Sequence, residues 1–119
     1  MARVLIVDDN RDTADSYAVL VSLWGHETRK AYDGESVLQQ ALAFQPHVVM
    51  LDIGLPKLDG YDVARRLRQY QSLVGLTIVA VTGHAAPEHA QERKDAGFDE
   101  HFAKPIDNEL LRAYLTQFT

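Results

Sequence analysis

Three short apolar runs recur along the chain, and each is rich in β-branched side chains. They span Val4–Val7, Val48–Leu51 and Ile78–Val81. Continuous apolar runs of this length are typical of strands that are buried on both faces, which require helices above and below. Two weaker segments, Glu27–Ala31 and Glu100–Ala103, are the remaining predicted strands.

Helical segments with start and stop signals separate these strands. The predicted helices cover Asp12–Trp24, Glu35–Phe44, Tyr61 to about Tyr70, Pro87–Ala96, and a last segment after Lys104-Pro105. Each follows one predicted strand, so that strand and helix alternate along the whole chain. Such alternation with short connections predicts an α/β fold, in which helices cover both faces of a five-stranded parallel sheet.

The last two predicted helices differ in how firmly they can pack. The last helix has a broad apolar face that should dock firmly. This face consists of Leu110, Leu111, Tyr114, Leu115 and Phe118. The fourth helix offers mainly Ala90 and Ala96 among charged and polar residues, so its burial contributes little stability. We interpret it as a loosely held element of the kind that moves in switching, with a solvated helix of no signalling role as the alternative.

Composition and charge narrow the classes of function. The 119 residues include 12 basic and 17 acidic side chains, a formal net charge of −5, and no cysteine. The lack of cysteine excludes thiolate metal sites, iron–sulfur clusters and a disulfide scaffold. The acidic balance argues against direct binding to nucleic acid or to a membrane surface. Because no signal-peptide core or membrane span is visible, we expect one cytoplasmic domain over residues 1–119.

Polar residues follow four of the predicted strands. Asp8 and Asp9 come after the first strand, Asp52 after the third, Thr82 after the fourth and Lys104 after the fifth. In a doubly wound sheet of order 2-1-3-4-5 the first and third strands are adjacent, and ligands bind beyond their carboxyl ends. The three carboxylates would then share one pocket, where a raised carboxyl pKa, a lysine or a divalent cation must offset their repulsion. Oxygen ligands without histidine or cysteine favour Mg²⁺ or Mn²⁺.

This set of groups is suited to phosphoryl transfer onto an aspartate. Aspartate forms covalent phosphoryl intermediates, and the transition state spreads charge over oxygens that the protein must neutralise. The cation would contact one of these oxygens, Lys104 a second, and the Thr82 hydroxyl with a nearby backbone N–H a third.

Four segments resemble the receiver domain of two-component response regulators over essentially the whole chain. They are Val4–Asn10, Met50–Gly60, Val81–Gly83 and Ala96–Pro105. The resemblance implies a flavodoxin-like (βα)5 fold with strand order 2-1-3-4-5. It also implies a phosphoprotein that acts as a signalling switch rather than as an enzyme on other substrates.

The resemblance further implies a role for each site residue. Asp52 would be the phosphoacceptor, with Asp8 and Asp9 as the acidic pair. Together with Asp52 and the backbone carbonyl of Gly54, this pair would hold Mg²⁺, with Asp9 as a direct ligand. Thr82 would be the switch hydroxyl and Lys104 the contact to the phosphoryl group. A cis Lys104-Pro105 bond is also expected.

Three positions depart from common patterns of the family. The resemblance implies that the positions of Gly54 and His84 influence the rate of dephosphorylation. Phe102 is assigned to the aromatic switch position, where tyrosine is common, with a plain core aromatic as the alternative. A basic run, Arg65, Arg66 and Arg68, is interpreted as a solvated helix face rather than as a phosphate site.

The expected phosphodonor is a phosphohistidine on a histidine kinase or a histidine phosphotransfer protein. The signal would pass to an output domain or partner, and the chain is either a stand-alone regulator or part of a larger regulator or hybrid kinase. The fourth helix, fifth strand and fifth helix form a candidate homodimer face. The alternative functions are a phosphatase of the haloacid dehalogenase type, which requires Asp-x-Asp, and an FMN-binding module, whose phosphate Asp8 to Asp12 would repel.

Overall fold

The computed structural model describes residues 1–53, 59–83 and 90–118. The strands are β1 (Arg3–Val7), β2 (Glu27–Ala31), β3 (Val48–Asp52), β4 (Thr77–Thr82) and β5 (Glu100–Ala103). The helices are α1 (Arg11–Leu23), α2 (Gly34–Phe44), α3 (Gly60–Arg68), α4 (Ala90–Ala96) and α5 (Asn108–Leu115), with short 3-10 helices η1 (Gln71–Leu73) and η3 (Thr116–Phe118). The predicted strands and their alternation with helices are confirmed. The predicted start of the fourth helix at Pro87 lies outside the described residues.

The sheet is parallel throughout and has the order β2-β1-β3-β4-β5, which confirms the predicted doubly wound topology. β1 lies between β2 and β3, with Val7 opposite Leu51 in the register. Asp8 follows Val7 and Asp52 follows Leu51, so the two aspartates lie side by side. The topology alone brings these two carboxylates to one edge of the sheet.

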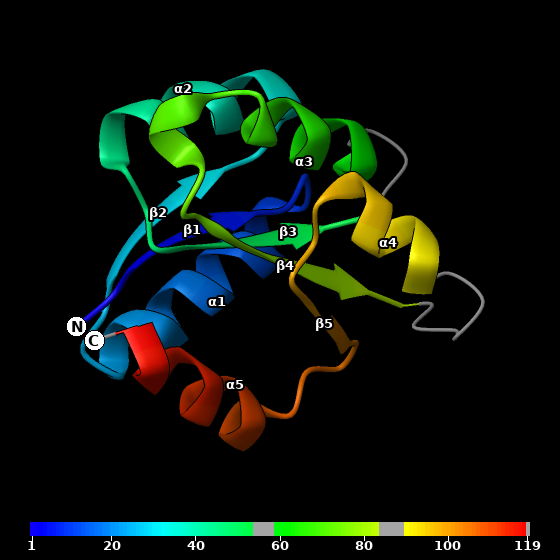
Figure 1. Ribbon diagram of the computed structural model, residues 1–119. Coiled ribbons are helices and arrows are strands. Elements are labelled where there is room, and N and C mark those ends of the chain that lie inside the picture. The colour runs from blue at the N-terminus through cyan, green and yellow to red at the C-terminus, as the bar shows by residue number, and fades with distance from the viewer. Residues whose placement is uncertain (54–58, 84–89, 119) are drawn as a thin grey trace.

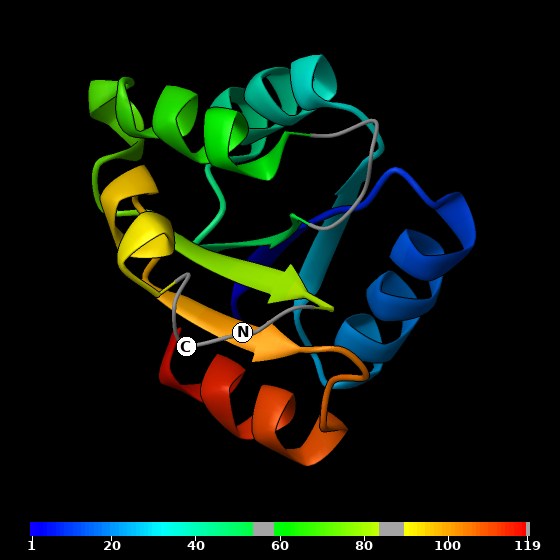
Figure 2. The same cartoon turned by 90° about the vertical axis from the view of Figure 1, so that its right-hand side faces the viewer.

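Two apolar layers sandwich the sheet (Figure 1). On one face, side chains from α2, α3 and α4 pack with Leu5, Val49, Leu51, Ile78 and Ala80. On the other face, α1 and α5 cover Val4, Ile6, Met50, Val79 and Val81. Figure 2 shows the same two layers from the side of α4 and β5. In the described ranges, the structure has no helix that is both long and apolar enough to cross a membrane.

Side-chain caps fix where four of the helices begin. Asn10, Asp33, Asp59 and Asp107 each precede a helix and accept a hydrogen bond from a backbone N–H of its first turn. These caps satisfy donors that the first helical turn leaves free. The cap at Asn10 positions α1 directly after Asp8 and Asp9, so it also shapes the acidic edge of the sheet.

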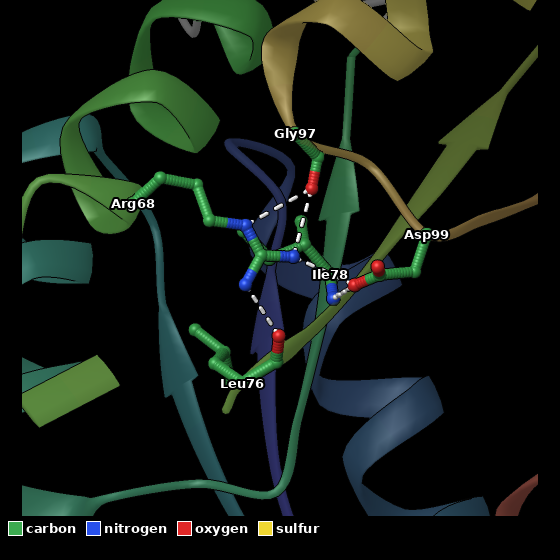
Figure 3. A network of polar contacts seen from close by, with 5 residues as sticks. All are labelled: Arg68, Leu76, Ile78, Gly97 and Asp99. Atoms are coloured by element: carbon green, nitrogen blue, oxygen red, sulfur yellow. Dashed lines mark hydrogen bonds and ion pairs between the residues drawn. The ribbon is translucent and has the colours of Figure 1, made fainter. Parts of the chain in front are cut away.

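The structure corrects two predictions about helix surfaces. Leu110 was expected on the packed face of the last helix but is 60% exposed, whereas Leu111 and Leu115 are fully buried. Arg68 was expected on a solvated face. Instead its guanidinium turns inward and donates hydrogen bonds to the carbonyls of Leu76 and Gly97 (Figure 3).

Candidate functional site

Two buried carboxylates lie side by side at the carboxyl edge of the sheet. Asp8 follows β1 and is 3% exposed, and Asp52 ends β3 and is 2% exposed. The backbone of Asp8 is held by its N–H, which donates to the carbonyl of Ala31 at 3.2 Å. Asp52 is followed by Ile53, whose N–H donates to the carbonyl of Val81 at 3.1 Å. Both carboxylates are thus fixed by strand pairing on either side.

Lys104 joins this pair from the far end of the chain. Its Nζ contacts Oδ2 of Asp52 and lies 4.0 Å from Oδ2 of Asp8. The backbone N–H of Lys104 donates to the carbonyl of Thr82 at 2.9 Å, which continues the pairing of β5 with β4 and directs the side chain toward β3. The Lys104-Pro105 bond is cis, as predicted.

The charged groups in this cluster shift one another's pKa values. Burial raises the pKa of Asp8 from 3.8 to about 6, and the nearby charge of Asp52 adds to this rise. The N–H of Asn10 donates to Oδ1 of Asp8 at 2.9 Å, and this bond, like the charge of Lys104, lowers the pKa in part. Burial alone would lower the pKa of Lys104, but the hydrogen bond and charge of Asp52 outweigh it, so the pKa is raised. The lysine therefore stays protonated.

The residues expected to hold a metal ion are only partly assembled. Asp8 and Asp52 converge, whereas Asp9 is half-buried beside them. Within the described ranges, no three acidic or histidine side chains are close enough to form a metal-binding group. Gly54 lies outside the described residues, as does His84. Because Mg²⁺ commonly takes one or two carboxylates and keeps several waters, the oxygen donors of Asp8 and Asp52 fit this ion.

Thr82, the last residue of β4, is 3% exposed and lies on the sheet face covered by α3 and α4. This face follows from the alternation of β4, in which Ile78 and Ala80 pack with those helices while Val79 and Val81 face α1 and α5. Thr82 lies opposite Ala103 in β5, whose next residue is Lys104. Thr82 therefore ends the strand that lies between the strands of Asp52 and Lys104.

The structure does not support the switch role predicted for Phe102. Phe102 lies opposite Val81 and packs with the α1 and α5 layer, its ring 5.6 Å from that of Tyr114 in an edge-to-face arrangement. It therefore occupies the face opposite to Thr82, so a movement of the hydroxyl cannot open space for this ring. The alternative, a core aromatic, agrees with the packing.

The sequence predicts no role for His101, but the register of β5 gives it a notable position. It lies opposite Ala80 and so shares the face of Thr82 and α4. The signal that could have found it is the two-residue alternation of a strand, counted back from Ala103. That count needs the register of β5 against β4, which the sequence does not give.

Comparison with known proteins gives the family. The profile of the response regulator receiver domain matches residues 4–116. The chain is 31% identical over 113 residues to the DNA-binding dual master transcriptional regulator RpaA of Synechocystis sp., covering 95% of this chain and 47% of that protein. It is 32% identical over 111 residues to the response regulator MprA of Mycobacterium ulcerans, covering 93% and 47%. The chain thus spans about half the length of these relatives.

Solved structures show the same fold. The chemotaxis response regulator CheY4 of Vibrio cholerae superposes with a TM-score of 0.89 at 27% identity, over 100% of this chain and 99% of that one. A putative response regulator from Chloroflexus aurantiacus gives 0.87 at 29% identity, over 98% and 96%. These matches favour the receiver interpretation over the phosphatase and FMN alternatives. The chain belongs to the response regulator receiver domain family, whose members act as phosphoacceptors in two-component signalling.

Proposed function

We propose that Asp52 is the phosphoacceptor of this receiver domain and that a phosphohistidine on a histidine kinase or histidine phosphotransfer protein is the donor. A carboxylate oxygen of Asp52 forms the new bond to phosphorus while the bond from phosphorus to the imidazole nitrogen breaks. The imidazole leaves with the electron pair and takes a proton from solvent. The observation that carries this proposal is the contact of buried Asp52 with Lys104, beside a second buried carboxylate.

The neighbouring groups neutralise the charge that arrives with the phosphoryl group. Lys104, already protonated and directed at Asp52, donates to one phosphoryl oxygen. The Thr82 hydroxyl, on the adjacent strand, donates to another. Bound Mg²⁺, or Mn²⁺, would offset the remaining negative charge on the phosphoryl oxygens, held by Asp8, Asp9, Asp52 and the Gly54 carbonyl.

In this proposal the domain is a signalling switch, which catalyses its own phosphorylation and dephosphorylation but acts on no other substrate. Thr82 is drawn toward the phosphoryl group, and His101, on the same face of the sheet, is the side chain that responds. The surface formed by α4, β5 and α5 would then control an output domain, a partner protein or a homodimer. This domain itself would work in the cytoplasm without contacting nucleic acid or a membrane.

The test is the intact mass of the protein after incubation with acetyl phosphate and Mg²⁺. We expect the wild type to gain one phosphoryl group that hydroxylamine removes, and Asp52→Asn to gain none. Asp33→Asn is the matched control, because Asp33 is an exposed carboxylate at the same sheet edge whose helix cap asparagine can replace. The proposal fails if Asp52→Asn is labelled at the rate of Asp33→Asn.

A further inference from the structure

The described part of α4 has few groups that pack against the rest of the protein. Of residues 91–96, only Arg93 and Ala96 are buried. Ala96 joins the apolar layer of α2 and α3, but it contributes a single methyl group. The docking of this helix therefore depends strongly on what the side chain of Arg93 does.

Arg93 is a poor anchor because its charge is buried and, among the described residues, only part of its guanidinium finds a partner. The residue is 4% exposed, and its Nη1 has no hydrogen-bond acceptor in the part of the chain that the structure describes. Its guanidinium shares a hydrogen bond with the hydroxyl of Tyr61 on α3, which is a neutral group, and the charges of Glu92 and Arg65 act on the same tyrosine. Burying a guanidinium without a full set of partners costs free energy, so this side chain weakens the packing of α4 on α3.

The C-terminal end of α4 is held in the opposite manner. Arg68 of α3 donates to the carbonyl of Gly97 from Nε at 3.1 Å and from Nη2 at 2.8 Å (Figure 3). Its Nη1 donates to the carbonyl of Leu76 at 2.5 Å, and its Nη2 pairs with Asp99 at 2.6 Å. The same oxygen of Asp99 accepts the N–H of Ile78 at 2.9 Å. One guanidinium thus ties the end of α4 to the start of β4.

Gly97 adds a backbone feature to this fixed end. Its φ is +102°, in the left-handed region that glycine adopts at little cost, and it ends the helix there. A Cβ atom at this position would lie 2.9 Å from Cγ of Arg68. The stem of Arg68 therefore lies so close to the backbone of Gly97 that it leaves no room for a side chain at position 97.

We propose that α4 is a lever hinged at Gly97: Arg68 and Asp99 fix its C-terminal end to β4, while the buried guanidinium of Arg93 keeps its body weakly docked on α3. The body of the helix then leaves α3 more readily than the end at Gly97 leaves β4. This property belongs to the unmodified protein, so it does not depend on the identity of the phosphoacceptor.

The lever is tested by amide hydrogen exchange of the unmodified protein at residues 91–96. Arg93→Met keeps an unbranched stem of similar length but removes the charge. We expect exchange at least about tenfold slower than in the wild type, because an apolar group replaces a buried guanidinium whose Nη1 has no acceptor among the described residues. Lys94→Met, which removes an exposed charge from the same helix, should change exchange by less than about twofold.

Other outcomes overturn the lever. Unchanged or faster exchange in Arg93→Met, or failure of this variant to fold, would show that the guanidinium holds α4 in place. An equal slowing in Lys94→Met would show that helix charge in general, and not the buried group, sets the exchange rate.

The hinge is tested by Arg68→Lys, whose ammonium cannot grip the Gly97 carbonyl through two donors. We expect exchange at residues 97–99 to rise at least about tenfold, with a smaller change at residues 91–93. Arg66→Lys is the matched control, since Arg66 lies on the same helix in an exposed ion pair with Asp62. Equal responses of the two segments in Arg68→Lys would contradict a hinge at Gly97.

Discussion

The ammonium group of Lys104 contacts the carboxylate of Asp52, although 52 positions separate the two residues along the chain. The contact exists because β5 and β3 both end at the same edge of a parallel sheet, with β4 between them. It places the cation against two buried carboxylates that would otherwise repel one another. The chemistry of the site and the stability of this edge therefore depend on the same lysine.

Lys104→Met should lower the free energy of unfolding by about 2 kcal/mol, because it leaves Asp8 and Asp52 buried without their cation. Adding Mg²⁺ should recover part of this loss, since the ion supplies positive charge to the same oxygens. Urea unfolding with and without Mg²⁺ measures both effects. Lys30→Met, which removes an exposed ion pair with Asp15, should lower the free energy of unfolding by much less than Lys104→Met does and show no such recovery. Full stability of Lys104→Met without Mg²⁺ would contradict this account.

Gly97→Ala should destabilise the fold by more than Gly25→Ala. Both glycines have a positive φ, +102° and +94°, so each alanine bears a backbone cost of about 1 kcal/mol. Only at Gly97 does the new Cβ also meet Arg68, whereas nothing lies within 4 Å at Gly25. Thermal unfolding of the two variants isolates the contact with Arg68. Equal losses would show that this side chain yields without cost.

His26 makes the stability fall as the solution becomes acidic. Its Nδ1 accepts the N–H of Ala2 at 3.0 Å, and burial, aided by the N-terminal charge, holds the pKa of this histidine below 6.5. Below pH 6.5 the unfolded chain takes up a proton that the folded protein does not, so the free energy of unfolding decreases until the lowered folded pKa is reached. His26→Asn keeps an acceptor but does not titrate.

Urea unfolding of both proteins at about pH 7.5 and about pH 5.5 tests this, and the difference between them removes the opposite contribution of Asp8. The wild type should lose stability relative to His26→Asn at the lower pH. A constant difference between the two proteins would contradict the assigned direction.

Substitutions at Phe102 and His101 should have different effects, the first on stability and the second on switching. Phe102→Leu removes an edge-to-face ring contact and should cost about 1 kcal/mol in stability, while leaving the response of residues 90–103 to beryllofluoride intact. His101→Ala should leave stability nearly unchanged, because the side chain is exposed, but should reduce that response. Hydrogen exchange with and without beryllofluoride measures the response. The reverse pattern would restore the switch role to Phe102.

The sequence predicts the fold well because each buried strand is a short continuous apolar run, such as Val48–Leu51. The alternation of these runs with helices leaves few possible topologies. It places Asp8, Asp52, Thr82 and Lys104 at one edge for the same reason. Arg68 and Arg93 could not be read this way. The sequence pattern around an arginine does not reveal whether its guanidinium reaches water, two carbonyls or the hydroxyl of a neighbouring helix.

The face of Phe102 was predictable only with the register of β5. A shift of one residue in a strand moves every side chain to the other face of the sheet, and Val81 opposite Phe102 fixes that choice. The short, largely exposed pattern of β5 gives no such register on its own. The pairing of β5 with β4, rather than the local composition of β5, therefore decides which side chain can respond to a movement of Thr82.

Mapping the modified residue tests whether Asp52 receives the phosphoryl group. Borohydride reduction converts an aspartyl phosphate to homoserine, which peptide mass spectrometry locates after phosphorylation with acetyl phosphate and Mg²⁺. We expect homoserine at position 52 alone. Homoserine at position 8 or 9, with Asp52 unmodified, would contradict it.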